Sequence, residues 1–122
     1  MPSEDSSVLE RSARPPDATW AYGGLPDQVA DVYAAASGRP PRATVVVVHG
    51  GFWRPKYDRA HARPLAAAVA DHGYLVVSLE YRRVPGLPDE TIADLETALT
   101  ALPPLLTGHA AHGVPVVVVG HS

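Results

Sequence analysis

The chain has 122 residues, 46% of them hydrophobic, and it contains no cysteine. This length allows at most one small domain, and the hydrophobic content is sufficient for a buried core. Thirteen acidic and ten basic residues give a formal net charge of −3, which offers no electrostatic reason to expect nucleic acid or an anionic membrane as a partner. Without cysteine, disulfide bonds and thiolate zinc sites are excluded.

The beginning of the chain and its apolar runs indicate neither secretion nor membrane insertion. The stretch Met1 to Asp5 is acidic and lacks the basic and then apolar pattern of a signal peptide. The apolar runs have the length of strands and are far too short to cross a bilayer. We therefore expect a soluble, cytoplasmic protein.

Residues 1–19 are mainly polar, charged or proline residues, with Val8 and Leu9 as the sizeable apolar side chains. We predict a flexible N-terminal arm over this range and one folded unit over residues 20–122. The glycines and proline between Trp20 and Asp27 predict a turn. Gln28 to Ala35 is a weak early strand, because its apolar residues alternate poorly.

Three later segments have the β-branched, apolar composition of buried strands. They are Thr44 to Val48, Tyr74 to Leu79 and Val114 to Val119. Because a helical pattern lies between each pair of segments, the order strand, helix, strand, helix, strand predicts an α/β fold with a parallel sheet.

The first helix is predicted from near Arg59 to His72, and it is firm only after Arg63. Pro64 is tolerated in a first turn alone, where its missing N–H breaks no helical bond. Gly73 suits the left-handed conformation that ends helices.

The second helix is predicted from Asp89 to Leu102, where leucine and isoleucine recur at spacings of three and four residues. The acidic residues of its first turn suit the helix dipole. Pro103-Pro104 is predicted to end it, which makes Leu105 to Gly113 a connection.

The first chemical motif follows the run of valines from Val116 to Val119. Four consecutive valines predict a strand that is buried on both faces. Gly120-His121-Ser122 comes directly after it and matches the first half of a nucleophile elbow, Gly-x-Ser-x-Gly. Gly120 would permit the sharp turn, and Ser122 would be the nucleophile. The sequence ends before the second half of this motif.

The second motif, His49-Gly50-Gly51-Phe52, also begins directly after a predicted strand. Glycines there let the backbone approach a ligand closely and point N–H groups at it, as an oxyanion hole requires. We assign Gly50, Gly51 and Phe52 to the oxyanion hole. The candidate donors are the N–H groups of Gly51 and Phe52, and the remaining donor would be the residue after Ser122. An ordinary glycine turn explains this motif when it is taken alone. Two such motifs after adjacent strands favour the catalytic interpretation.

Together these segments resemble the front section of the α/β-hydrolase fold. His49-Gly50-Gly51-Phe52-Trp53 is similar to the oxyanion loop of the kynurenine formamidase and esterase branch, and the resemblance covers roughly Tyr22 to Ser122. It implies that the Thr44 to Val48 strand lies between the other two predicted parallel strands. It also implies a triad completed by an Asp or Glu and a His downstream of Ser122, and this chain contains neither.

No residue in the sequence is a convincing substitute for the missing base. Two histidines flank the proposed site in positions that suit structural roles, two belong to the first helix and its approach, and two lie in the last connection. In that order they are His49, His121, His61, His72, His109 and His112. The last pair is better explained by a solvated loop than by a metal site, so no metal or cofactor is predicted.

Other charged and aromatic residues have simple structural explanations. Glu80, like the acids of the second helix, is attributed to capping and surface pairing. Arg82-Arg83 is attributed to solvation or salt bridges. Trp53 suits a substrate pocket and packing over the sheet about equally well.

Two classes of function remain open. The first is that a longer parent protein is a serine hydrolase whose small-molecule substrates are carboxylic esters or aryl formamides. The chain alone would then be inactive, because the base and the orienting acid are missing. The alternative is a non-catalytic α/β binding module or degenerate hydrolase relative. Nucleotide binding has little support, because both glycine-rich phosphate-binding motifs are absent. The valine strand is also predicted to be an exposed sheet edge and an aggregation hazard.

Overall fold

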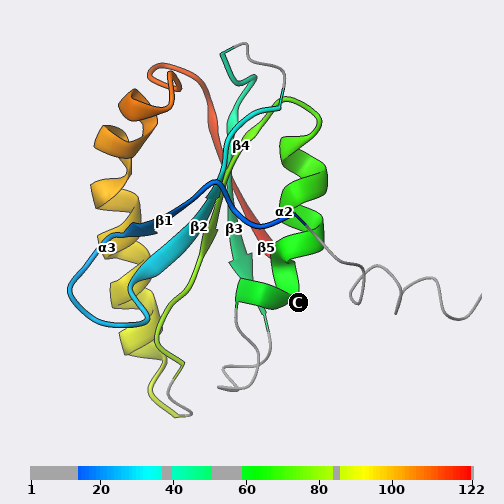
Figure 1. The fold of residues 1–122 in the computed structure, drawn as a ribbon. Coiled ribbons are helices and arrows are strands. Elements are labelled where there is room, and N and C mark those ends of the chain that lie inside the picture. Colours follow the sequence, from blue (N-terminus) through cyan, green and yellow to red (C-terminus); the bar gives the residue numbers. More distant parts are fainter. Residues whose placement is uncertain (1–13, 37–39, 51–58, 84–85, 122) are drawn as a thin grey trace, which may run out of the picture.

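The computed structural model describes residues 14–36, 40–50, 59–83 and 86–121. Within these residues, five strands form one sheet in the order β1-β2-β4-β3-β5 (Figure 1). The strands are β1 (Ala18–Ala21), β2 (Val29–Tyr33), β3 (Thr44–His49), β4 (Leu75–Leu79) and β5 (Val116–His121). The helical elements are η1 (Arg59–Ala62), α2 (Arg63–Ala70) and α3 (Pro88–Gly108).

The sheet is mixed, and its parallel half is the part that the sequence predicts. β3 pairs in parallel with both β4 and β5, so the predicted central position of β3 is confirmed. β2 pairs antiparallel with β4, and β1 pairs antiparallel with β2. The weak early strand is thus present as β2. β1 was not predicted, and it begins at Ala18, inside the range expected to form the arm.

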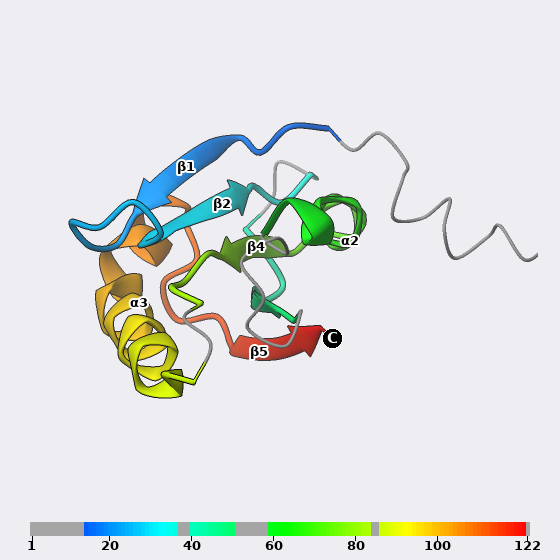
Figure 2. The same cartoon turned by 90° about the horizontal axis from the view of Figure 1, so that it is seen from below.

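The two α-helices cover opposite faces of the sheet, α3 on one side and α2 on the other (Figures 1 and 2). On the α3 face, Val46 and Val77 lie side by side in register and pack in one core cluster with Ala98 and Leu102 of the helix. On the α2 face, Val47 and Val76 belong to a second cluster, built around alanines: Ala62, Ala66, Ala67 and Ala70. Because residues alternate between the faces of a strand, His49 and Glu80 fall on the α2 side.

The start and end of α2 confirm the sequence prediction. Pro64 lies within the first two helical positions, and η1 precedes it from Arg59. Gly73 adopts a φ angle of +93°, and its N–H donates to Ala70 O at 3.0 Å. The alanine face allows the helix to lie close to the sheet, because small side chains leave little space between them.

The predicted end of the second helix is wrong. α3 continues through Pro103 and Pro104 to Gly108. Leu102 and Leu106 are both buried in the α3-face cluster, and the two prolines are exposed. Burying the leucines outweighs the hydrogen bonds that the prolines remove, so the segment after Leu105 is helix before it becomes a connection.

The valines of β5 are not buried on both faces, contrary to that prediction. Their exposed fractions are 43% for Val116, 47% for Val117, 54% for Val118 and 36% for Val119. β5 is the last strand in the sheet order, and Figure 2 shows it beyond the main area of contact between the helices and the sheet. The separate prediction of an exposed apolar edge is therefore confirmed. No helix within the described residues is long and apolar enough to cross a membrane.

Candidate active site

The two predicted motifs leave the sheet at the same edge, from neighbouring strands. In the parallel register of β3 and β5, Val48 pairs with Gly120 and His49 pairs with His121. Gly50 therefore follows one member of the last pair, and residue 122 follows the other. Ligand sites of open α/β sheets commonly lie outside the carboxyl ends of such strands.

The structure describes only part of the predicted site. Gly50 is half-buried, and Gly120 lies within β5. A Cβ atom added at Gly120 would meet no atom within 4 Å, so no close contact among the described residues requires glycine there. His121 is the last residue of β5, and the four other positions of the prediction lie outside the described residues. These are Gly51, Phe52, Trp53 and Ser122.

A buried hydrogen-bonded pair, His49 and Glu80, joins the carboxyl ends of β3 and β4 directly beside Gly50. His49 Nε2 lies 2.8 Å from Glu80 Oε1, and the two side chains are 2% and 3% exposed. The Tyr81 ring stacks on the His49 ring, with 4.6 Å between the centroids and 18° between the planes. The Tyr81 hydroxyl donates to the His49 carbonyl oxygen, and His49 Nδ1 lies 3.0 Å from Gly50 O.

This arrangement gives His49 a structural role and leaves it unsuitable as a general base. One ring nitrogen faces a carboxylate and the other faces a carbonyl oxygen. The ring is almost completely buried and covered by Tyr81, so a substrate proton could not reach it. The interpretation of His49 as a packing and hydrogen-bonding residue is therefore confirmed.

Glu80 is the centre of this cluster, and its interpretation as a surface residue is wrong. Its Oε2 accepts the backbone N–H of Arg59 at 3.1 Å, and its Oε1 accepts the backbone N–H of Tyr81 at 3.1 Å. Arg83 Nη1 also donates to Oε1, and Arg59 Nη1 lies 3.5 Å from Oε2. Burial raises the pKa of Glu80, but the hydrogen bonds from His49 and Arg59 outweigh burial, so the net pKa is below the usual value.

A sequence signal for this pair existed in the strand register. His49 and Glu80 each come at the end of a strand predicted to be parallel and adjacent, so their side chains share a face and a level of the sheet. A histidine and a glutamate in that relation would be expected to pair. Reading Glu80 only within its own segment missed this.

A second buried acid, Asp31 of β2, holds the far end of the same cluster. Its side chain is 1% exposed, and its two oxygens accept from Arg59 Nε at 2.9 Å and Arg63 Nε at 3.2 Å. Arg59 thus bridges Asp31 and Glu80, and links β2, β4 and the start of η1.

On the opposite face, Asp94 of α3 organises an equivalent network. It accepts from Gln28 Nε2 at 2.9 Å and from the Arg82 backbone N–H at 2.8 Å, and it forms a salt bridge with the Arg82 guanidinium at 2.9 Å. Burial raises the pKa of Asp94, but the hydrogen bonds from Arg82 lower it by more than burial raises it. The net pKa of Asp94 is therefore below the usual value. The salt-bridge interpretation of Arg82 and Arg83 is confirmed, because Arg83 pairs with Glu80.

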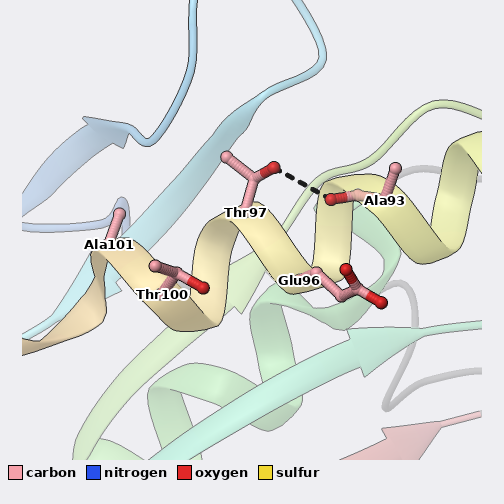
Figure 3. A pocket seen from close by; sticks show the side chains of 5 residues that line it. All are labelled: Ala93, Glu96, Thr97, Thr100 and Ala101. Atoms are coloured by element: carbon pink, nitrogen blue, oxygen red, sulfur yellow. Dashed lines mark hydrogen bonds between the residues drawn. The ribbon is translucent and has the colours of Figure 1, made fainter.

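A shallow hollow lies on the outside of α3, away from both motifs (Figure 3). It is lined by five residues of that helix: Ala93, Glu96, Thr97, Thr100 and Ala101. The Thr97 hydroxyl donates to the Ala93 carbonyl within the helix at 2.9 Å, so this polar group is satisfied locally. Among the described residues, no cluster of three or more His, Cys, Asp or Glu side chains could hold a metal ion.

Comparison with known proteins supports the fold. No protein-family model and no curated protein matches the sequence. Among solved structures, esterase B from Lactobacillus rhamnosis is 23% identical with a TM-score of 0.69, over 98% of this chain and 40% of that chain. Esterase 2 from Thermogutta terrifontis is 20% identical with a TM-score of 0.68, over 93% and 44%. A candidate thioesterase from Silicibacter sp. is 26% identical with a TM-score of 0.65, over 98% and 42%.

The chain therefore spans less than half the length of each of these proteins. At such identities the likeness shows the fold, and the described elements form part of an α/β-hydrolase fold, as predicted. The Lactobacillus esterase has also been determined with a tributyrin phosphonate inhibitor. The Thermogutta esterase has been determined with propionate and with butyrate.

Proposed function

We infer that this chain is the part of a serine hydrolase that carries the nucleophile and the oxyanion loop. The substrate would be a carboxylic ester or an aryl formamide. The observation that supports this best is the pairing of His49 with His121, because it starts the two motifs from neighbouring positions. Adjacent strands are about 4.8 Å apart, and each motif continues about 3.8 Å further at its next residue, so a scissile carbonyl could reach both.

In the proposed mechanism, Ser122 Oγ attacks the carbonyl carbon and a general base takes its proton. Backbone N–H groups of the oxyanion loop, those of Gly51 and Phe52 after Gly50, stabilise the oxyanion together with the N–H of the residue after Ser122. The tetrahedral intermediate collapses to an acyl-enzyme as the protonated alcohol or amine leaves. Water then attacks the acyl group, gives its proton to the same base, and releases the carboxylic acid and Ser122.

Esters with short acyl chains are the favoured substrates. The esterases that share the fold bind propionate, butyrate or a tributyrin phosphonate, which points to small acyl groups. The aryl formamide alternative rests on the sequence His49-Gly50-Gly51-Phe52-Trp53. Trp53 would line the acyl or aryl pocket.

The general base is expected to come from outside these 122 residues. Among the histidine side chains that the structure describes, His49 is engaged and buried. His72 is exposed next to the end of α2, and His109 and His112 precede β5 at its amino end. His49 lies near the carboxyl end of β5, but its ring is already engaged, and the other three lie toward the amino ends of the strands, so none of the four is placed to act as the base.

The test is to express the chain together with any sequence that continues its reading frame. We expect turnover of a short-chain aryl ester or of N-formylkynurenine, and loss of this turnover by about 10⁴-fold or more in Ser122→Ala. Thr100→Ala is the matched control, because it removes a hydroxyl at an exposed position of α3, and it should retain full activity. Absence of turnover together with no labelling of Ser122 by an organophosphonate would support the non-catalytic binding module instead.

The 122-residue chain alone should show at most a trace of activity, because a serine without base and orienting acid loses about 10⁴- to 10⁶-fold in rate. The same ester assay on the purified chain checks this. Efficient hydrolysis by this chain would mean that a partner or an unexpected histidine supplies the base.

A further inference from the structure

Glu80 contacts both ends of the segment that connects β3 to η1. The segment begins at Gly50 and ends before Arg59, and its residues 51–58 lie outside the described residues. Glu80 comes from a different strand, β4, and lies between these two ends on the α2 side of the sheet. Each of its two oxygens faces one end: Oε1 faces His49, and Oε2 faces Arg59.

At the first end, three contacts fix the backbone that leads into the oxyanion motif. Glu80 holds the His49 ring at Nε2, and the other side of that ring lies against the Gly50 carbonyl. Tyr81 holds the His49 carbonyl. Because a trans peptide unit is planar, its N–H points opposite to its C=O. The contact from Tyr81 to the His49 carbonyl therefore also sets the direction of the Gly50 N–H.

At the second end, Glu80 accepts the backbone N–H of Arg59 at 3.1 Å. The Arg59 guanidinium is held in turn by Asp31, whose carboxylate is 1% exposed, with 2.9 Å between Nε and Oδ1. Water competes poorly for these bonds, because Glu80 and Asp31 are almost completely buried.

We propose that Glu80 is a positioning residue for the candidate oxyanion loop, whose carboxylate fixes the two ends of the segment from Gly50 to Arg59. The catalytic part of this role rests on the proposed hydrolase function. A carboxylate suits the task because it has two acceptor oxygens, and charge-assisted hydrogen bonds are the stronger ones. The cost of burying it is offset by Arg83 and Arg59, which both pair with it.

Three substitutions separate hydrogen bonding from packing and from the loss of a buried charge. Glu80→Met preserves the approximate shape and removes every acceptor. In Glu80→Gln, the amide oxygen still accepts from the Arg59 N–H, and the amide N–H donates to His49 Nε2 once the ring proton resides on Nδ1, next to Gly50 O. The amide nitrogen cannot accept from the Tyr81 N–H or from Arg83 Nη1, so this variant keeps the bond at Arg59 and loses those two. Asp94→Asn is the matched control, since Asp94 is a fully buried carboxylate with an arginine partner on the other face.

The measurement is residue-level hydrogen–deuterium exchange of the 122-residue chain at low micromolar concentration. We expect Glu80→Met to increase exchange of the Arg59 and Tyr81 amides, which donate directly to Glu80, about tenfold more than that of the Val46 and Val77 amides, as one lost hydrogen bond would. In Glu80→Gln the Arg59 amide should remain within about threefold of the wild type. A purely space-filling role would predict no difference between Glu80→Met and Glu80→Gln at Arg59. Asp94→Asn should show no selective increase at Arg59 or Tyr81.

An equal increase throughout the sheet in Glu80→Met, or no increase at Arg59, would overturn the proposal. If Glu80→Met does not fold, Glu80→Asp replaces it. Its side chain is one methylene shorter and cannot reach both ends, so exchange should increase at one of them.

The exchange experiment needs no turnover, so it fails or succeeds independently of the hydrolase proposal. In an active longer chain, Glu80→Met should lower kcat by about tenfold or more with a smaller change in KM, and Glu80→Gln should not. The selective exchange pattern in a protein without hydrolase activity would refute the proposed function and leave the anchoring role intact. Turnover with unchanged kcat and unchanged exchange in Glu80→Met would refute the positioning role alone.

Discussion

The buried carboxylates Glu80 and Asp94 make folding sensitive to acid. The pKa of each is lowered in the folded chain by hydrogen bonds that outweigh burial. A carboxyl group whose pKa is lower in the folded chain than in the unfolded chain stabilises the fold. This stabilisation is complete at pH values above the unfolded pKa of about 4, and it is lost as the pH falls through the lower pKa of the folded chain. We therefore expect the free energy of unfolding to decrease steadily below about pH 4.5.

Urea unfolding between pH 7 and pH 2.5 checks this expectation. In Glu80→Gln, one of the contributing groups no longer titrates, so the loss of stability below pH 4.5 should be smaller than in the wild type. An identical pH dependence in the two proteins would show that Glu80 does not couple folding to protonation.

Tyr81 gives a second prediction for a single side chain. Burial raises the pKa of its hydroxyl, followed by the effect of the Glu80 charge, so the hydroxyl stays protonated and donates to the His49 carbonyl at neutral pH. Tyr81→Phe leaves that carbonyl unsatisfied and should cost about 1–3 kcal/mol of unfolding free energy. Tyr74→Phe, at a half-buried ring beside Arg42, is the control and should cost less than about 0.5 kcal/mol. Chemical denaturation of both variants decides the matter, and equal losses would contradict it.

Single residues show where sequence reasoning succeeds and where it stops. The structural role of His49 followed from its position in the motif. The burial of Glu80 did not, because it depends on two strands being adjacent and in register, which only the assembled sheet shows. Ser122 as nucleophile remains a prediction, and it rests on the motif and the strand before it.

At the level of whole elements, the prolines inside α3 lead to a prediction of increased stability. A proline in a helix interior costs about 3 kcal/mol, while the restriction it places on the unfolded chain returns about 0.4–1 kcal/mol. The cost to the helix therefore outweighs the gain from restricting the unfolded chain. Pro103→Ala and Pro104→Ala should each stabilise the fold by about 2 kcal/mol.

The matched control is Pro88→Ala. Pro88 begins α3, where the missing N–H has no helical partner to lose, so this substitution should change stability by less than about 1 kcal/mol. Thermal unfolding of the three variants provides the comparison. Destabilisation in Pro103→Ala would show that the proline is needed for the local geometry of the last turns.

The elements that sequence reasoning misjudged are those in which local preference and tertiary packing disagree. By local rules Pro103-Pro104 should end the helix. The burial of Leu102 and Leu106 on the inner side of α3 keeps the helix intact instead. β1 has four residues, three of them exposed, and so gives almost no apolar periodicity to detect. The long apolar strands and α2 were predictable because local pattern and burial agree.

For the molecule as a whole, the order of the parallel strands could be predicted, but the exposure of β5 required knowledge of what lies beside it. The four consecutive valines predict a strand that is buried on both faces. The described residues provide one neighbour, β3, and no strand beyond β5. The result is an apolar, uncharged edge with unpaired backbone groups, a feature that promotes association between chains.

We therefore expect the 122-residue chain to associate or to be poorly soluble, and a charge on β5 to reduce this. Val118 and Val46 are a matched pair, since they are adjacent in register on the same face, but they are 54% and 1% exposed. Val118→Lys should increase the monomer fraction in sedimentation velocity and change the unfolding free energy by about 0.5 kcal/mol or less. Val46→Lys should unfold the chain, because it places an unpaired charge in the core. A wild-type chain that is monomeric and unfolds in one sharp, reversible thermal transition would contradict the prediction, as would equal association of Val118→Lys and the wild type.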